Sequence, residues 1–220
     1  MSNRLAIFDC DGTLVDGMAN VCLAMERSFA RADLPAPERA ASRRVIGLSM
    51  VEAMQALLPD AEPDRHVDLA ESYKREFQAM RAEGLVSEPL YDGIADVIDA
   101  LEADGWLLGV ATGKSDRGLG ICLDHHGLTE RFISLQTADR HPSKPHPSMI
   151  EQAIADAGAS AETTMMIGDT SFDMAMARAA GVTAIGVAWG YHPPAELRAA
   201  GAHFIAETPA DIVTFAKAFA

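Results

Sequence analysis

The stretch that decides the fold is LAIFDCDGTLVD, residues 5–16. Its first four residues are apolar and end abruptly at Asp9 and Asp11, which the turn residue Gly12 follows. A short, bounded apolar run is typical of a strand buried on both faces, and side chains alternate sides along a strand. Asp9 and Asp11 are therefore predicted to share one side at the carboxyl end of a strand, whereas Cys10 points away into the core.

This pair of acids favours a metal-binding site, although only slightly when taken alone. Two carboxylates this close repel each other unless a cation or a shared proton relieves the repulsion. Ligands of α/β sheets bind outside the carboxyl ends of strands, which is where the two acids fall. The alternative is an ordinary strand end that runs into an Asp-Gly turn.

The length, charge and composition of the chain limit its possible domain organisation, partners and location. Its 220 residues suffice for a core domain that carries a smaller insert. A net charge of −14 argues against nucleic acid as a partner, but not against a small anionic ligand beside a metal ion. The three cysteines match no zinc spacing, and neither a signal peptide nor an apolar run long enough for a membrane span is present. We expect a cytoplasmic protein with no membrane partner, and its oligomeric state stays open.

The organisation of the chain changes twice. After Asp16 the apolar spacing is helical for about seventy residues, with helices predicted over 18–31, 37–47, 50–58 and 64–83. From Pro89 onward, strands and helices alternate, which predicts a doubly wound, mainly parallel α/β sheet. The predicted strands of this part are 106–111, 132–135, 164–167, 183–187 and 203–205. We therefore predict an α/β core formed by residues 1–16 and 87–220, with an inserted all-helical cap over 17–86.

Three more polar clusters follow predicted strands or begin helices of this core. They are Thr112-Gly113-Lys114, Lys144-Pro145, and Gly168-Asp169 with Asp173. Each one alone fits a structural role, because threonine and aspartate cap helices and lysine is usually a solvated surface charge. Together they lie along one edge of one parallel sheet. Acids for a divalent cation, beside a hydroxyl and an ammonium for an anion, describe a phosphoryl-transfer site.

The four segments resemble the four motifs of the haloacid dehalogenase superfamily, and specifically those of its phosphatases. Their order and spacing fit over nearly the whole chain. The helical insert resembles the cap of the subgroup that contains phosphoglycolate phosphatases, pyrophosphatases and β-phosphoglucomutases. The motif residues are, in chain order, Asp9-Cys10-Asp11-Gly12-Thr13, Thr112, Lys144-Pro145, and Gly168-Asp169 with Asp173.

The resemblance implies a mechanism. Asp9 attacks phosphorus to form an aspartyl-phosphate, and Asp11 acts as general acid and then as general base. Mg²⁺ is held by Asp9, the backbone carbonyl of Asp11 and Asp169, with Asp173 orienting these ligands. The residues implied to hold the phosphoryl oxygens are Thr112, Gly113 and Lys144.

The expected substrate is a small phosphorylated metabolite, with phosphoglycolate as the best guess by similarity alone. Specificity is predicted to come from the cap, with Arg44 as a substrate-binding residue. Asp11 argues against a dehalogenase, and Lys74, the only lysine of the cap, is better explained as a solvent-facing charge than as a Schiff-base residue. A phosphomutase stays open, since Arg43 and Arg44 offer charges for a phosphorylated sugar. An alternative of another class is a non-enzymatic signalling domain that is phosphorylated on aspartate.

Overall fold

The computed structural model describes residues 3–219, and strands of this range form one six-stranded sheet. The order across the sheet is β3-β2-β1-β4-β5-β6, and every neighbouring pair is parallel. The predicted doubly wound α/β fold is confirmed. The strands are β1 (Asn3–Phe8), β2 (Trp106–Thr112), β3 (Ser134–Thr137), β4 (Ala159–Gly168), β5 (Thr183–Val187) and β6 (Phe204–Ala206).

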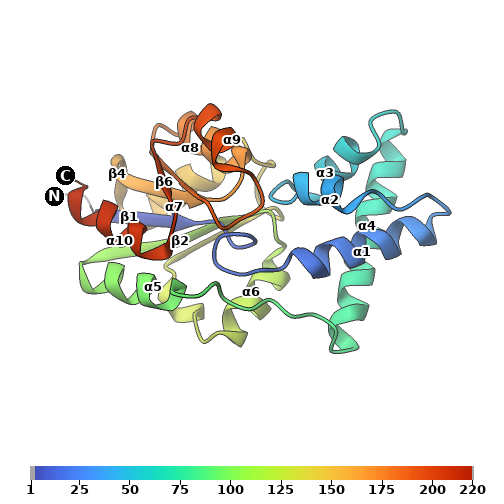
Figure 1. Cartoon of the computed structure of the whole chain (residues 1–220), viewed down its shortest axis with the longest axis horizontal. Coiled ribbons are helices and arrows are strands. Elements are labelled where there is room, and N and C mark those ends of the chain that lie inside the picture. Colours follow the sequence, from blue (N-terminus) through green and yellow to red (C-terminus); the bar gives the residue numbers. More distant parts are fainter. Residues whose placement is uncertain (1–2, 220) are drawn as a thin grey trace.

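Helices cover both faces of the sheet, as Figure 1 shows. Along β1, Ala6 and Phe8 pack into one hydrophobic cluster and Leu5 and Ile7 into the other, since strand side chains alternate. The first cluster is completed by α5 (Ile94–Ala103), α6 (Asp116–His125) and α10 (Pro209–Ala218). The second is completed by α7 (Ser148–Ala157), α8 (Ser171–Ala179) and α9 (Pro194–Ala199).

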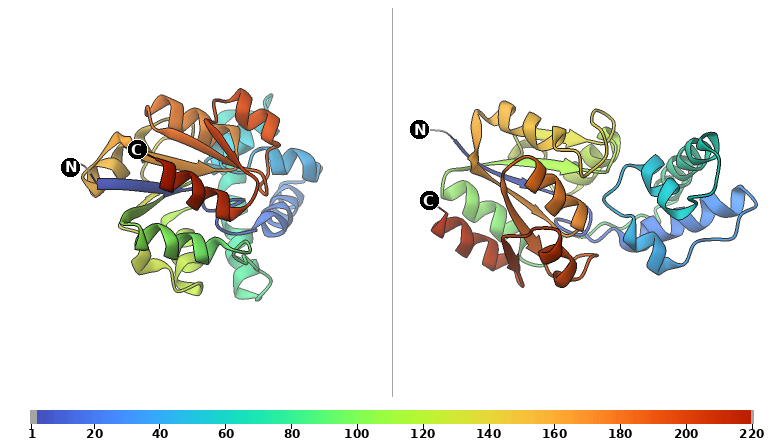
Figure 2. Two further views of the ribbon diagram at one scale, coloured as in Figure 1. Left: turned by 60° about the vertical axis from the view of Figure 1, so that its left-hand side comes forward. Right: turned by 90° about the horizontal axis from the view of Figure 1, so that it is seen from above.

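Four helices lie between β1 and α5 in the chain, and they form the inserted all-helical cap. They are α1 (Met18–Arg31), α2 (Arg39–Arg44), α3 (Met50–Leu57) and α4 (Pro63–Ala82). These helices share a hydrophobic cluster of their own, to which the core contributes Tyr191. Figures 1 and 2 show the helices beyond the carboxyl end of β1, to one side of the sheet. The domain boundaries at 17 and 86 stay predictions.

The chain crosses between core and cap twice, and the two crossings are bonded to each other. The backbone N–H of Asp16 donates to the carbonyl of Pro89 at 2.9 Å, next to an isolated antiparallel bridge between Val15 and Leu90. The Asn20 side chain donates to the carbonyl of Ser87 at 2.5 Å and accepts from its N–H at 3.2 Å. Cap and core are therefore joined by one paired segment instead of two independent linkers.

Three predicted elements differ from the structure. The strand expected over 164–167 begins five residues earlier, at Ala159, and ends at Gly168. The helix expected over 37–47 is confined to α2, and its last residues form a loop that turns toward the core. The strand expected over 132–135 begins later, at β3, after the short 3₁₀ helix η1 (Thr129–Arg131). Phe132 is buried in the core cluster but precedes the hydrogen-bonded ladder, so its apolar side chain suggested a strand too early. Among residues 3–219, none of the helices has the length and apolar character that crossing a membrane requires.

Candidate active site

The segment after β1 turns sharply and presents two acids to one cavity. The N–H of Leu14 donates to the carbonyl of Cys10 at 2.9 Å, and Gly12 adopts a positive φ of 83°. Asp9 and Asp11 both line the cavity that the core forms with the cap. The Cys10 side chain is buried on the other side, with its sulfur 4.0 Å from that of Cys122. The predicted alternation of side chains is confirmed.

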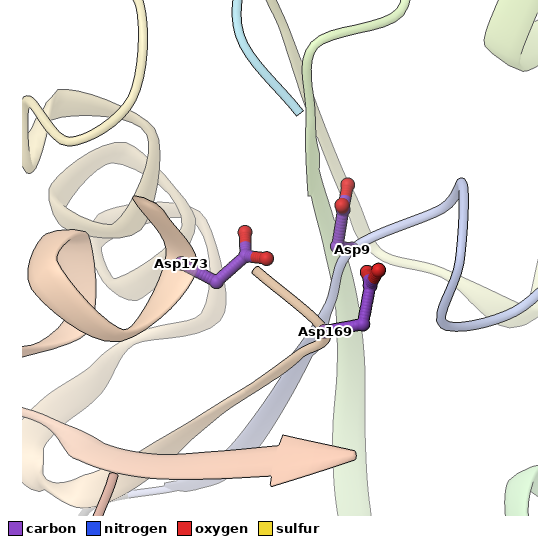
Figure 3. Close-up of side chains that lie close together, drawn as sticks. All are labelled: Asp9, Asp169 and Asp173. Carbon is purple, nitrogen blue, oxygen red and sulfur yellow. The ribbon is translucent and has the colours of Figure 1, made fainter. Parts of the chain in front are cut away.

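Asp9, Asp169 and Asp173 form a buried acid cluster. One carboxylate oxygen of each lies within 4.8 Å of the others, and each side chain is at most 1 % exposed. Figure 3 shows that the three come from the ends of β1 and β4 and from the start of α8. A Cβ at Gly12 would collide with the Asp169 carboxylate, so glycine at this position is needed for the approach. The sheet edge therefore brings Asp9 and Asp169 together, as predicted from their positions at the carboxyl ends of strands.

Lys144 lies inside this cluster and is almost fully buried. Its Nζ is 2.9 Å from Oδ1 of Asp9 and 2.6 Å from Oδ1 of Asp173. Burial alone would lower the pKa of Lys144, but the Asp173 and Asp9 carboxylates outweigh burial and raise the pKa above its ordinary value. The structural alternative of a solvated surface lysine is therefore wrong.

One ammonium does not balance three carboxylates. Burial raises the pKa of Asp9 to about 7, with Lys144 opposing the shift and Asp173 adding to it. Burial also raises the pKa of Asp169, and the charges of Asp9 and Asp173 raise it further. Both pKa values are raised mainly by burial and further by the neighbouring carboxylates, so the ionised carboxylates repel each other here. A divalent cation removes this repulsion, because it favours the ionised forms.

The unused oxygens of the cluster fit such a cation. Oδ2 of Asp9 is buried and has no hydrogen-bond partner among the described residues. Asp169 accepts single hydrogen bonds on its two oxygens, from the Thr13 hydroxyl at 2.9 Å and the Tyr191 N–H at 2.8 Å. Each oxygen retains a lone pair, and carboxylate oxygens are the ligands that hard divalent ions prefer. The acid cluster therefore fits a metal site.

Asp173 accepts more hydrogen bonds from side chains than Asp9 or Asp169 does, and both of its oxygens are used. One oxygen bonds Lys144, and the other accepts from both the N–H and the hydroxyl of Thr170, at 2.9 and 2.7 Å. These bonds belong to the capping box of α8, so the capping role expected as an alternative for this residue is correct. The same bonds fix Lys144 and the first turn of α8 around the acid cluster.

Thr112 and Gly113, which are predicted to hold phosphoryl oxygens, line the same cavity as Asp9 and Asp11. We call this part of the core wall the phosphoryl region. The Thr112 hydroxyl is buried and accepts from the N–H of Lys114 at 3.2 Å, which leaves its proton free to donate. The N-cap of α6 is Ser115, so the capping alternative for Thr112 is wrong. A Cβ at Gly113 would lie 2.8 Å from the carbonyl oxygen of Leu48, in the cap loop. Glycine thus permits the cap loop to lie directly against this strand end.

A second charged group, not assigned from the sequence, contacts Asp11. Lys114 Nζ lies 3.0 Å from Oδ1 of Asp11 and 2.6 Å from Oε1 of Glu88, and Oε2 of Glu88 accepts from Arg81 of α4 at 2.7 Å. We name these four residues the Asp11–Arg81 chain. It is largely buried and connects the first motif to a cap helix. The sequence placed Lys114 in the Thr112-Gly113-Lys114 cluster, but it gave the lysine side chain no role of its own.

Arg44 is not brought to the site. Its Nη1 pairs with Glu196 of α9 at 2.6 Å, the side chain is half exposed, and it is not among the residues that line the cavity. The neighbouring Arg43 donates to the carbonyl of Gly190 at 2.8 Å. Both arginines therefore connect the cap to the core. The role of Arg44 in substrate binding stays a prediction, for a side chain that lies outside the cavity lining.

Two residues of the loop after β5 support the site through contacts that the sequence did not predict. The N–H of Tyr191 bonds Asp169, and its hydroxyl oxygen accepts from the N–H of Gly17 at 3.2 Å. The imidazole of His192 accepts from the N–H of Ser171 and contacts the carbonyl of Arg44 across the cap boundary. Neither contact has a sequence signature, because both depend on tertiary placement.

Fold and site together define a class of protein: a hydrolase with a parallel α/β core whose polar motifs gather beyond the strand ends, under a helical cap. The family profile described as haloacid dehalogenase-like hydrolase matches residues 6–187. The chain belongs to this family, and the predicted membership is confirmed.

Two relatives that are more than 30% identical to this chain are named as phosphatases. A protein of Dickeya dadantii named "Probable phosphatase IndB" is 36% identical over 219 residues, with 97% of this chain and 94% of the relative covered. A phosphoglycolate phosphatase of Mesorhizobium japonicum is 31% identical, covering 87% of this chain and 85% of the relative. The crystal structure of a predicted phosphatase from Clostridium acetobutylicum has the same fold, with a TM-score of 0.87, 22% identity and 98% of each chain covered. The chain is accordingly a phosphatase-type enzyme that is similar to phosphoglycolate phosphatases.

Proposed function

We propose that this enzyme is a Mg²⁺-dependent phosphatase that hydrolyses a phosphomonoester through an aspartyl-phosphate on Asp9. The observation that carries the proposal is the state of the Asp9 carboxylate. One oxygen is held by Lys144, whereas the other is buried beside the cavity and has no hydrogen-bond partner within residues 3–219. A carboxylate is a weak nucleophile, so it needs a fixed position and a positive environment to attack phosphorus.

The proposed reaction has two steps. An oxygen of Asp9 forms a bond to phosphorus while the ester bond breaks, and Asp11 gives its proton to the departing oxygen. Asp11 then takes a proton from water, whose oxygen attacks phosphorus and releases inorganic phosphate from Asp9. Burial raises the pKa of Asp11, with Lys114 opposing and Glu88 adding to the shift, which suits a group that must carry a proton in the first step.

Thr112, Gly113 and Lys144 hold the phosphoryl oxygens in this proposal. A hydroxyl, a backbone N–H and an ammonium are donors of the kind that stabilise charge as it develops on the equatorial oxygens. Mg²⁺ would be held by Asp9, the backbone carbonyl of Asp11 and Asp169, with Asp173 orienting Lys144. When bound, the ion supplies positive charge that neutralises the phosphoryl group and the acids.

The contacts of Arg43 and Arg44 in the cap favour a phosphatase over a phosphomutase. A mutase must also hold a second phosphate on the sugar, and the arginines considered for that role are engaged by Gly190 and Glu196. The non-enzymatic signalling alternative is disfavoured by the phosphatase relatives. Among phosphomonoesters, phosphoglycolate is the candidate that similarity alone supports.

The test is phosphate release from a panel of phosphorylated metabolites, with Mg²⁺ and after EDTA treatment. We expect multiple turnovers with Mg²⁺ and a loss of at least about 100-fold after chelation. Mg²⁺ at 100 times its dissociation constant should also stabilise the fold by about 2.7 kcal/mol, read as a raised Tm, and Asp169→Asn should abolish the shift. Full activity in metal-free buffer would refute the metal assignment. Transfer of phosphate between two substrate positions without release would support the mutase instead.

A further inference from the structure

A cavity of about 920 Å³ lies between the phosphoryl region and the cap. Asp9, Asp11 and Thr112 belong to its core wall, and the opposite wall comes from α3, α4 and the loop 45–49. The N–H of Ser49 donates to the hydroxyl of Ser143 at 2.8 Å, so the loop is bonded to the core and closes one side. The view from above in Figure 2 shows how α1–α4 stand opposite the strand ends.

The cap wall of this cavity is largely apolar. Its aliphatic and aromatic side chains come from the loop 45–49, from α3 and from α4, so the apolar lining does not depend on a single segment. Several of them are only partly buried, which leaves carbon surface facing the cavity. The side chains that matter here are Ile46, Leu48, Met50, Val51, Tyr73 and Phe77.

The cations that line the cavity are mostly neutralised by the protein. Lys74 pairs with Glu71 at 2.8 Å, and Lys114 and Arg81 belong to the Asp11–Arg81 chain. Arg117, which is exposed on α6, is the one lining cation without an ion pair among the described residues. A second anionic group on the substrate therefore meets little free positive charge beyond the phosphoryl region.

A cavity of this volume also exceeds what a two-carbon acid needs. Volumes of 300–1,000 Å³ are typical of sites that enclose ligands of drug size. Phosphoglycolate would leave most of the apolar wall exposed to water, and burying that wall against carbon is favourable.

We propose that the cap wall binds the leaving group of a phosphomonoester that carries an extended apolar portion, alkyl or aromatic, and no second compact anion. This inference rests on the proposed phosphatase function. It predicts which phosphomonoesters the enzyme hydrolyses with the highest kcat/KM. Phosphoglycolate then falls below larger, more apolar esters. The phosphoryl group occupies the core wall, and the organic group lies against Val51 and Phe77.

Linear alkyl phosphates test this directly, because ethyl and n-hexyl phosphate release alcohols of nearly equal acidity. The chemistry at phosphorus is thereby held constant, so a difference in kcat/KM between the two esters measures how the alkyl chain binds to the cap wall. Each buried methylene contributes about fourfold, so we expect kcat/KM to be at least about 10-fold higher for the hexyl ester. Phosphoglycolate should lie near or below the ethyl ester.

A pair of matched variants locates the effect. Val51→Ser removes apolar surface from the wall, whereas Val67→Ser makes the same change on an exposed valine of α4 that does not line the cavity. The hexyl-to-ethyl ratio should fall at least about threefold in the first variant and stay within error in the second. Thermal unfolding of both variants shows whether they are folded.

Binding without turnover separates this inference from the proposed function. Calorimetry with hexyl- and ethylphosphonate, which are not hydrolysed, should give a lower Kd for the hexyl compound by a similar factor. If no ester is hydrolysed but hexylphosphonate still binds more tightly, the phosphatase proposal fails and the apolar wall stands. Equal values for the two chain lengths, or a preference for phosphoglycolate, would overturn the inference even in an active phosphatase.

Discussion

At the scale of single residues, Asp9 occupies an environment that is costly for a carboxylate. It is buried, burial raises its pKa to about 7, and one of its oxygens has no hydrogen-bond partner in the described part of the chain. Unfavourable burial of this kind is retained at functional sites because the chemistry requires it. The acid cluster should therefore limit stability while it enables activity.

The first prediction concerns Asp9→Asn. The substitution keeps the shape but removes the nucleophile and one of the repelling charges. We expect phosphate release to fall by about 10⁴-fold or more, while the midpoint of urea unfolding is unchanged or higher. Asp124→Asn, at an exposed position of α6, is the matched control and should alter neither. Activity within tenfold of the parent protein would exclude Asp9 as nucleophile.

Gly113 supports a second residue-scale prediction, because its φ is not positive and alanine there brings no backbone strain. The added Cβ would lie 2.8 and 2.9 Å from the carbonyl oxygens of Leu48 and Gly47, so the cap loop must move. We expect kcat/KM to fall about 10-fold or more through KM.

Gly120→Ala on α6 is the control for this prediction, since no neighbouring heavy atom lies within 4 Å of its added Cβ. In a helix this change should stabilise the fold by about 0.5–1 kcal/mol and leave kinetics alone. Equal kinetics for the two alanine variants would show that loop contact at Gly113 is irrelevant to substrate binding.

At the scale of secondary-structure elements, the bounds of helices with periodic apolar residues could be predicted from the sequence. Those of short helices without such a pattern could not. The helix α1 matches its predicted range, 18–31, because the apolar spacing of a helix marks it. The helix α9 was not predicted, since its six residues contribute one buried side chain, Leu197, and show no periodic pattern. The early end of α2 also has no local signal, because the loop that follows it is held by contacts with the core.

The Asp11–Arg81 chain gives a prediction about stability and pH. Burial would raise the pKa of Glu88, but Lys114 and Arg81 outweigh burial and lower the pKa below its ordinary 4.5. A lowered pKa means that ionised Glu88 contributes stability above about pH 4.5, and that the contribution is lost as pH falls through the folded-state pKa. Glu88→Gln should therefore cost about 1–3 kcal/mol at pH 7, with the difference from the parent shrinking below pH 4.5.

Urea unfolding at several pH values measures this difference. Glu71→Gln breaks the exposed pair with Lys74 and should cost under about 0.5 kcal/mol at any pH. A loss for Glu88→Gln that is as small as this control, or one that does not change with pH, would contradict a stabilising role for the chain.

At the scale of the whole molecule, the sequence predicted the position of the site better than it predicted which residues determine substrate specificity. The acids, Thr112 and Lys144 follow strand ends, and strand ends of a parallel sheet meet at one edge, so their assembly was predictable. The role of Arg44 was not, because Glu196 lies 152 residues further along the chain. The partners of Asp11 were missed for the same reason: Lys114 and Glu88 meet only when the cap crossings are folded.

The central claim, a phosphoryl group covalently held by Asp9, is tested most directly by chemical trapping. An aspartyl-phosphate is reduced by borohydride to homoserine, and mass spectrometry then locates the change within the tryptic peptide that begins at Leu5. Quenching the enzyme during turnover with Mg²⁺ and a phosphomonoester should give homoserine at position 9, absent without substrate and absent in Asp9→Asn. Homoserine at position 11 or 169, or none at any position while phosphate is released steadily, would contradict the account.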